Sequence, residues 1–144
     1  MGKINWTRVL LGGLVAGVVG NILFFAAWGP LVGRTLSAVL QTLGHPMQET
    51  VGTAVSMIVL VFVMGILYIW LYAAVRPRYG GGPGTAALLG VVLGLLVGVS
   101  PDIGWGLTLR FIPAKVWVGD ALFGLVASVL MTVLGAWVYK EGMR

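Results

Sequence analysis

The chain has 144 residues, of which 59% are hydrophobic and only 9% are charged, and its mean hydropathy is +1.03. These values exclude a water-soluble domain, because soluble proteins carry about 25% charged residues. The sequence contains no cysteine and one histidine, which excludes disulfides, thiolate metal sites and a haem held by two histidines of one chain. The composition therefore predicts a membrane protein whose side chains carry out no redox chemistry.

Long stretches without Asp, Glu, Lys or Arg predict four membrane spans. The uncharged stretches cover residues 9–33, 51–75, 79–101 and 121–139. As helices they are long enough to cross roughly 30 Å of hydrocarbon. We place the spans, within a single domain over residues 1–144, at about 8–32, 51–75, 84–108 and 117–139. The predicted fold class is an all-α integral membrane protein with four transmembrane helices.

The distribution of Lys and Arg predicts the orientation of the chain. The terminal segments and the middle loop hold Lys3, Arg8, Arg76, Arg78, Lys140 and Arg144. The other two connections hold Arg34, Arg110 and Lys115. Because positive charge is in excess on the cytoplasmic side, we expect both termini to be cytoplasmic. All the tryptophans lie near predicted span ends, as an interfacial belt requires.

The connection after the first span contains an amphipathic segment. Apolar residues recur at helical spacing from Leu36 to Leu43, and Gly44 and Pro46 end the pattern. We expect a short helix at about 34–43 that lies on the outer membrane surface. Its low charge favours an anchoring role over binding to anionic lipid.

The two halves of the chain are similar in sequence. Aligned without gaps, the second span matches the fourth, with Trp70 on Trp137 and Tyr72 on Tyr139, and the first span matches the third. We predict a tandem repeat of a two-helix hairpin, with units at about 5–78 and 84–141; chance similarity among Leu, Val and Gly is the alternative. Copies with two spans each share one orientation, so their pseudo-twofold axis would follow the membrane normal.

Small residues recur at helical spacing and predict close helix packing, because van der Waals fit drives association in lipid. The predicted packing residues are Gly12, Gly13, Ala16, Gly17, Gly20, Gly90, Gly94, Gly98, Gly124 and Ser128. We expect the first and third spans to meet along these faces. The second span carries large apolar side chains and is expected to face lipid.

Asn21 is the first of two candidate polar site residues. It lies midway along the first span and shares a helix face with Gly13 and Gly17. The favoured interpretation is an interhelical hydrogen bond, and the alternative is a role in transport or ligand binding.

Asp102 is the second candidate, and its depth depends on Pro101. A kinked helix continuing past the proline would hold the carboxylate inside the outer leaflet, whereas a helix ending at Val99 would place it at the surface. Intramembrane acids are candidates for function. The favoured interpretation is an ion pair with a cation on the same side, namely Arg110, Lys115 or Arg34.

The remaining polar residues predict no catalytic, cofactor or metal site. Asp120 is expected to stabilise the start of the fourth helix through the helix dipole. His45 and Glu49 have the spacing of a metal pair, but Pro46 lies between them and no third ligand is close in sequence. The net charge of +5 predicts anchoring to anionic lipid and not nucleic-acid binding.

Two segments, Ile4 to Gly17 and Leu71 to Gly80, resemble small uncharacterised four-span proteins of bacterial inner membranes. The resemblance covers about a sixth of the chain, and it implies a bacterial inner-membrane location and no activity. Small multidrug exporters carry an acid in the first span, where this chain has Asn21.

The small-residue faces and the lack of catalytic groups predict a non-enzymatic accessory or scaffolding subunit that packs in a homo-oligomer or with other membrane subunits. The alternative is a small oligomeric channel or transporter that uses the interface between the first and third spans, with Asn21 and Asp102 on the path. An enzyme acting on a lipid-soluble substrate ranks third, because the acids and the histidine are too dispersed to form an acid–base pair.

Overall fold

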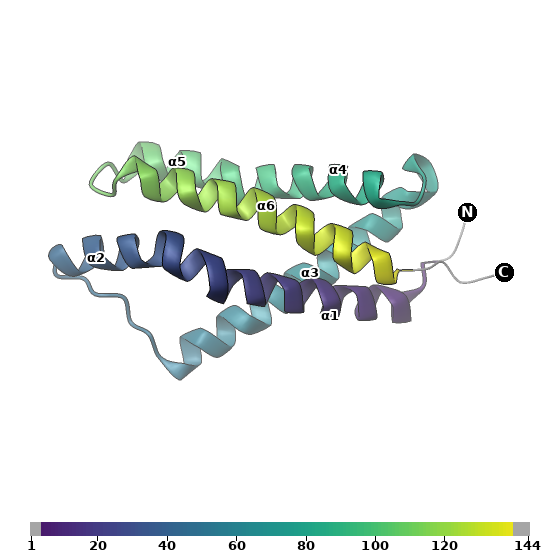
Figure 1. Cartoon of the computed structure of the whole chain (residues 1–144), viewed down its shortest axis with the longest axis horizontal. Helices are drawn as coiled ribbons and strands as arrows, with labels where there is room; N and C mark the ends of the chain where they lie inside the picture. The colour runs from purple at the N-terminus through teal and green to yellow at the C-terminus, as the bar shows by residue number, and fades with distance from the viewer. Residues whose placement is uncertain (1–3, 140–144) are drawn as a thin grey trace.

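The computed structural model describes residues 4–139, which form helices and short connections without a strand (Figure 1). Four helical segments run in alternating directions: α1 (Trp6–Leu23), η1 (Phe24–Gly33) and α2 (Arg34–Thr42) without a break; α3 (Val51–Tyr79); α4 (Pro83–Gly94), η2 (Leu95–Val99) and α5 (Ser100–Thr108) without a break; and α6 (Ala114–Val138). Each segment is long and apolar enough to cross a membrane. Lys3, Lys140 and Arg144, which contributed to the predicted orientation, lie outside the described residues.

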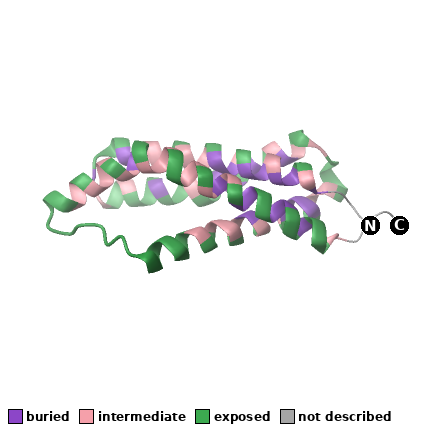
Figure 2. Ribbon diagram, turned by 60° about the horizontal axis from the view of Figure 1, so that its bottom comes forward, coloured by how far each residue is buried: buried purple, intermediate pink, exposed green. Residues whose placement is uncertain are grey.

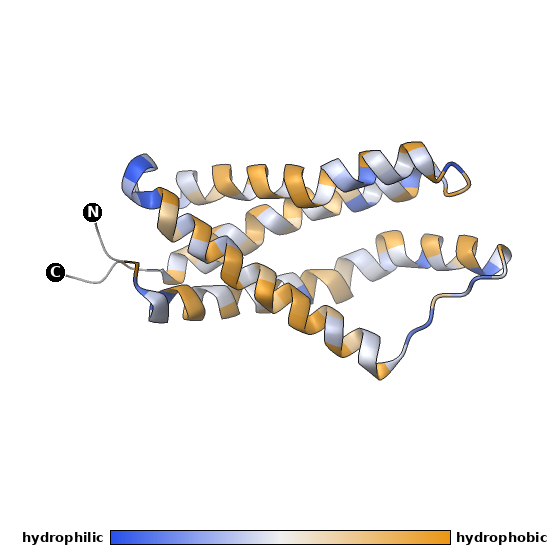
Figure 3. Ribbon diagram, turned by 180° about the vertical axis from the view of Figure 1, so that it is seen from behind, coloured by the Kyte–Doolittle hydropathy of each residue, from blue (hydrophilic) through white to orange (hydrophobic). Residues whose placement is uncertain are grey.

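The bundle has two ends that differ in what they hold. The terminal end contains Ile4, Tyr139 and the turn between α3 and α4, and the α2 end contains α2 and the turn between α5 and α6 (Figure 1). At the terminal end the Asn5 backbone N–H donates to the Tyr139 hydroxyl at 3.4 Å. Hydropathy follows the same axis, because apolar residues cover the spans and polar residues gather at the turns (Figure 3).

The helix ends follow from local sequence signals. Thr50 caps α3 by accepting from the Thr53 backbone N–H, and the Thr53 hydroxyl accepts from the Thr50 backbone N–H. The turn that follows α3 needs glycine, because φ is +83° at Gly80 and +137° at Gly82. Pro83 then starts α4 at a position where its missing N–H costs no helical hydrogen bond.

Glycines bring the helices of each hairpin into backbone contact. A methyl group at Gly13 would lie 2.5 Å from the Cα of Ile66 on α3, and one at Gly90 would lie 2.6 Å from the Cα of Val129 on α6. Gly12 on α1 is equally close to α6, because a methyl group there would lie 2.6 Å from the Gly135 carbonyl oxygen. In lipid, such close approach supplies the dispersion energy that holds helices together.

The helix pairing differs from the predicted one. Spans one and three do not meet: α1 packs against α3 and α6, α4 packs against α6, and α1 shares no comparable interface with α4 among the described residues. The reason is that the glycines of the first and third spans pack against other helices, namely α3 and α6. Gly90 and Gly94 contact α6, whereas Gly12 and Gly20 lie against both α3 and α6.

The two hairpins also differ in how they pack. The sequence alignment pairs Gly12 with Gly90, yet the atoms nearest Gly90 belong to its own hairpin partner α6, whereas Gly12 lies against both its own partner α3 and α6 of the other hairpin. Equivalent faces therefore make different contacts, and the tandem repeat stays a prediction from sequence.

Helix α3 is the least enclosed span. Its most apolar stretch is 17% buried, compared with 33% for the first and last spans. Its first half diverges from the bundle and carries exposed residues (Figures 1 and 2). This arrangement agrees with the expectation that the second span faces lipid.

The segment expected to form a separate outer helix is helical but continues the first span. Helix α2 begins directly after η1, with no turn at Gly33 or Arg34. Leu36 and Val39 pack on a small core around Val32 with residues from the α5–α6 region. Placement of this helix on a membrane surface stays a prediction.

Candidate functional site

Two π-helical stretches, η1 and η2, lie in the half of the bundle near the α2 end. In η2, the Ser100 N–H donates to the Leu95 carbonyl oxygen, five residues back, and η1 ends in the same way with Arg34 and Gly29. Each π-helical stretch lies at a proline: Pro101 follows η2 and Pro30 is inside η1. A proline ring would clash with the carbonyl four residues earlier in an α-helix, and a wider turn relieves that clash.

A cavity of about 430 Å³ lies between these two wide turns and helices α3, α5 and α6. Such π-helical stretches occur frequently at functional sites. Both stretches line the cavity, with Phe24 and Trp28 from η1 and Val97 from η2. Helix α5 supplies Asp102 and α6 supplies Asp120. We call this space the acidic cavity.

The two carboxyl groups come from different spans and lie close enough to interact. Asp102 is only 8% exposed. Asp120 accepts a hydrogen bond from the Trp28 indole N–H at 2.7 Å. Backbone packing of Gly98 against Gly124, where a methyl group would lie 3.0–3.2 Å from the facing Cα, brings the two acids opposite each other.

The rest of the wall is aromatic with a few polar groups. The hydroxyl groups of Tyr68 on α3 and Ser128 on α6 share a hydrogen bond of 3.2 Å. Trp105 and Trp117 line the space near the acids. The Trp117 indole N–H is buried without a hydrogen-bond partner in the described part of the chain, and its ring lies over Gly106, 3.1 Å from where a methyl group would be.

The structure selects among the alternatives for Asp102. The helical segment continues through Pro101 to Thr108, so the carboxylate is inside the span and not after its end. No ion pair joins Asp102 to a cation in residues 4–139; Arg110 instead donates its Nε–H to the Leu107 carbonyl oxygen at 3.4 Å. Arg34 and Lys115 are exposed.

Asn21 is not part of this cavity. Its side-chain N–H groups donate to the Gly17 carbonyl oxygen at 2.9 Å and to the Ile58 carbonyl oxygen of α3 at 3.4 Å. It therefore joins two helices, and the structure does not bring it together with Asp102.

Sequence reasoning did not assign three residues to this site: Trp28, Tyr68 and Asp120, of which Asp120 was considered only for a role at the helix start. The assignment of Asp120 to the helix start was wrong, because α6 begins at Ala114 and Asp120 lies in its second turn. Its spacing to Gly124 and Ser128 was the available signal, since it put the acid on the packing face of the helix. Trp28 and Tyr68 showed no such local pattern.

The site does not have the ligands of a metal centre. Within residues 4–139 no group of three His, Cys, Asp or Glu side chains could hold an ion. The acidic cavity instead brings two carboxyl groups together among aromatic side chains.

Together these helices define a class: an all-helical, multi-pass membrane protein. The particular family stays open, because no protein-family model, curated protein or solved structure matches the chain.

Proposed function

We propose that this protein binds an apolar organic cation in the acidic cavity and acts as a small, non-enzymatic channel or transporter for such molecules. The observation that supports this most strongly is the convergence of Asp102 and Asp120 in an aromatic cavity, without a basic partner among residues 4–139. The proposal keeps the transport alternative considered from the sequence but moves it from the interface between spans one and three to the cavity lined by η1, α3, α5 and α6.

Electrostatics favour a cationic ligand. Asp102 is buried, and a buried carboxylate beside a second carboxyl group is costly unless one of them binds a proton or positive charge is near. The Trp28 N–H reaches Asp120 but brings no charge. A bound cation would supply that charge and interact with both acids at once.

The aromatic wall favours an organic cation over a metal ion. Tryptophan is the best aromatic partner for a cation, and Trp28, Trp105 and Trp117 all line the cavity. A volume of about 430 Å³ is in the range of small-molecule sites, which bury apolar ligands against a few fixed polar groups.

The accessory or scaffolding role stays a second prediction without a specific structural observation in its favour. The glycine faces that suggested it are occupied by helices of the same chain. Homo-oligomers and partner subunits would have to use other surfaces.

The proposed location is the bacterial inner membrane with cytoplasmic termini. This orientation follows from Lys and Arg near the span ends, and it puts the α2 end and the acidic cavity on the outer side. A cation arriving from outside would then reach Asp102 about 9 Å from the end of its span, six residues from Thr108.

The test measures binding of tetraphenylphosphonium to the purified full chain in lipid nanodiscs, with tryptophan fluorescence as the signal. We expect saturable binding, and weakening by at least about tenfold in Asp102→Asn and in Asp120→Asn, since a charge contact in a water-poor site is worth about 1.4 kcal/mol or more. Triphenylphosphine oxide, which is neutral and similar in shape, should bind weakly.

Glu49→Gln is the matched control, because Glu49 is an exposed acid at the same end of the bundle, outside the cavity. Equal affinities in all variants, or no binding by the unmodified chain, would refute the cation site. Uptake of the same cation into proteoliposomes then separates transport from binding: carboxyl-dependent binding without uptake would leave a receptor or sensor and exclude the transporter.

A further inference from the structure

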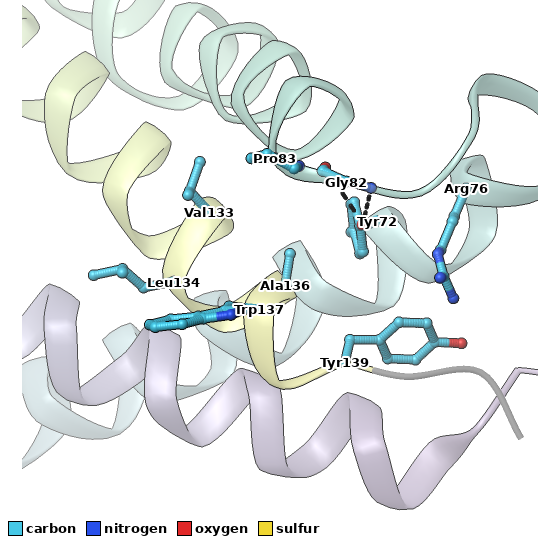
Figure 4. Close-up of a pocket in the computed structure, with 9 residues that line it drawn as sticks. All are labelled: Tyr72, Arg76, Gly82, Pro83, Val133, Leu134, Ala136, Trp137 and Tyr139. Atoms are coloured by element: carbon cyan, nitrogen blue, oxygen red, sulfur yellow. Dashed lines mark hydrogen bonds between the residues drawn. The ribbon is translucent and has the colours of Figure 1, made fainter.

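A second cavity lies at the terminal end, at the edge of the packed core, which contributes Tyr72, Ala136 and Tyr139 to its lining. It has a volume of about 380 Å³ and lies where α6 faces the end of α3 and the turn into α4 (Figure 4). Its only charged lining residue among those described is Arg76. We call it the arginine cavity.

The Arg76 guanidinium is held by aromatic and turn contacts. Its central carbon lies 5.7 Å from the ring centroid of Tyr139. Tyr139 in turn meets Tyr72 edge to face, with ring centroids 6.0 Å apart. The Tyr72 hydroxyl accepts a hydrogen bond of 2.9 Å from the Gly82 N–H, which fixes the turn beside the arginine (Figure 4).

Gly81 makes room for this arrangement. A methyl group at Gly81 would lie 2.9 Å from one terminal nitrogen of Arg76 and 3.0 Å from its central carbon. The side chain that would have to move is the flexible end of an arginine, so a substitution here would displace the guanidinium with little cost to the fold.

The opposite wall is apolar. Val133, Leu134 and Ala136 of α6 line the cavity with Pro83 of α4. Trp137, at its edge, is 82% exposed, so the cavity opens toward the surface of the bundle. A ligand that fits both walls has an anionic group next to an apolar chain.

Among residues 4–139, the charged side chains at the end that holds this cavity are all basic. All the acids among the described residues, Glu49, Asp102 and Asp120, belong to the α2 end or its adjoining loop. The terminal end has Arg8, Arg76 and Arg78. Anions are therefore attracted to this end over several ångströms.

We propose that the arginine cavity binds the phosphate group of an anionic phospholipid, with an acyl chain along the apolar wall of α6. A guanidinium carries five N–H donors and matches phosphate geometry, so it can bind a phosphate in addition to another contact. The arginine cavity lies near the exposed Trp137 at the end of a span, which is the depth of lipid headgroups. This inference does not rest on the cation site.

The experiment measures thermal unfolding of the delipidated full chain in neutral detergent, with phosphatidylglycerol or with phosphatidylcholine of the same acyl chains. We expect phosphatidylglycerol to raise the unfolding temperature more than phosphatidylcholine. Arg76→Gln should weaken phosphatidylglycerol binding by about tenfold, as loss of a charge-assisted hydrogen bond does. Gly81→Ala, which keeps the charge but displaces the guanidinium, should weaken it by a smaller factor.

Arg78→Gln is the matched control, because Arg78 is exposed, lies two residues away and does not line the cavity. An equal loss in Arg76→Gln and Arg78→Gln would overturn the proposal in favour of nonspecific attraction. Equal stabilisation by inorganic phosphate would overturn the lipid as ligand. If Arg76→Gln does not fold, unchanged affinity in Gly81→Ala would refute the site on its own.

Discussion

The two ends of this bundle hold cavities of similar size and opposite charge. At the α2 end, the buried Asp102 and the half-buried Asp120 line a cavity beside π-helical stretches of two spans. At the terminal end, the largest core cluster fills the space between the spans, and the cavity with Arg76 lies beside the turn. Buried residues follow this division, because many of them lie in the terminal half (Figure 2).

The difference shows how one chain separates stability from binding. The core of the terminal half is closely packed at glycines and serves stability, and the arginine cavity adjoins it at the turn between α3 and α4. In the other half, prolines lie at or next to the π-helical stretches that line the acidic cavity, where the two acids favour a positive ligand. Substitutions at the two ends should therefore differ in their effects on binding and on stability.

Reversing the charge in the acidic cavity should abolish cation binding. In Asp102→Arg the new guanidinium would pair with Asp120 and occupy the position of the ligand. We expect affinity for tetraphenylphosphonium to fall at least about a hundredfold, or about 2.7 kcal/mol, while thermal stability is kept because the acid gains a partner. Titration in nanodiscs measures the first and thermal unfolding the second.

Glu49→Arg makes the same change of charge on an exposed residue of the loop before α3. If it weakens binding as much as Asp102→Arg, the general field of this end matters and the cavity does not.

Adding one methyl group should lower the unfolding free energy at a packed glycine of α1 but not at an open glycine of α5. Gly13→Ala would drive a Cβ to 2.5 Å from the Ile66 backbone, forcing α1 and α3 apart. We expect a loss of about 1–3 kcal/mol in unfolding free energy, the usual cost of overpacking. Gly104→Ala, in α5 where a methyl group meets no described atom within 4 Å, should be neutral or slightly stabilising. Unfolding in mixed micelles measures both, and equal effects would contradict the glycine contact.

Removing the proline beside the acid should trade binding for stability. Pro101→Ala restores an N–H and allows η2 to return to α-helical hydrogen bonding, which narrows the cavity. We expect a gain of about 1 kcal/mol in stability, less than the ~3 kcal/mol of an unrelieved proline because the wide turn already avoids the clash. Affinity for tetraphenylphosphonium should fall about tenfold, or about 1.4 kcal/mol.

Pro83→Ala is the comparison, since Pro83 is the first residue of α4, where proline fits a helix. It should change neither quantity. A binding loss in Pro83→Ala equal to that in Pro101→Ala would show that the cavity is not shaped by the wide turn.

The sequence was sufficient to predict the spans, because they depend on a local pattern, whereas for Asp102 it left two depths open and favoured an ion pair that residues 4–139 do not form. Uncharged length marks a span, and Pro101 inside an apolar run marks a kink near Asp102. Close packing by small residues was also predictable, since Gly13, Gly90 and Gly94 contact other helices.

Which helices meet was not predictable, because a glycine face is compatible with any partner. Asp102 lies four residues beyond Gly98, and Asp120 lies four residues before Gly124. If the two glycines face each other in antiparallel helices, the acids must face each other as well. The sequence contained this relation, but it becomes evident only once α4 and α6 are known to be partners.

Trp28 could not be placed in advance for a different reason. A proline two residues later normally ends a helix, yet η1 continues past Pro30 into α2. Only because the helix continues does Trp28 reach Asp120 on α6.

The smallest expected effect concerns Asn21, the other polar candidate. Its hydrogen bond to Ile58 joins α1 to α3 outside the acidic cavity. Asn21→Leu should therefore cost only about 0.6 kcal/mol, the average for such bonds between membrane helices, and tetraphenylphosphonium affinity should not change. We would measure unfolding in mixed micelles and binding in nanodiscs for Asn21→Leu and Asp102→Asn in parallel. The comparison sets a polar residue that joins helices against one that lines a cavity. A tenfold loss of affinity in Asn21→Leu would place the ligand path along α1 and α3, and the proposed division between packing and binding would then fail.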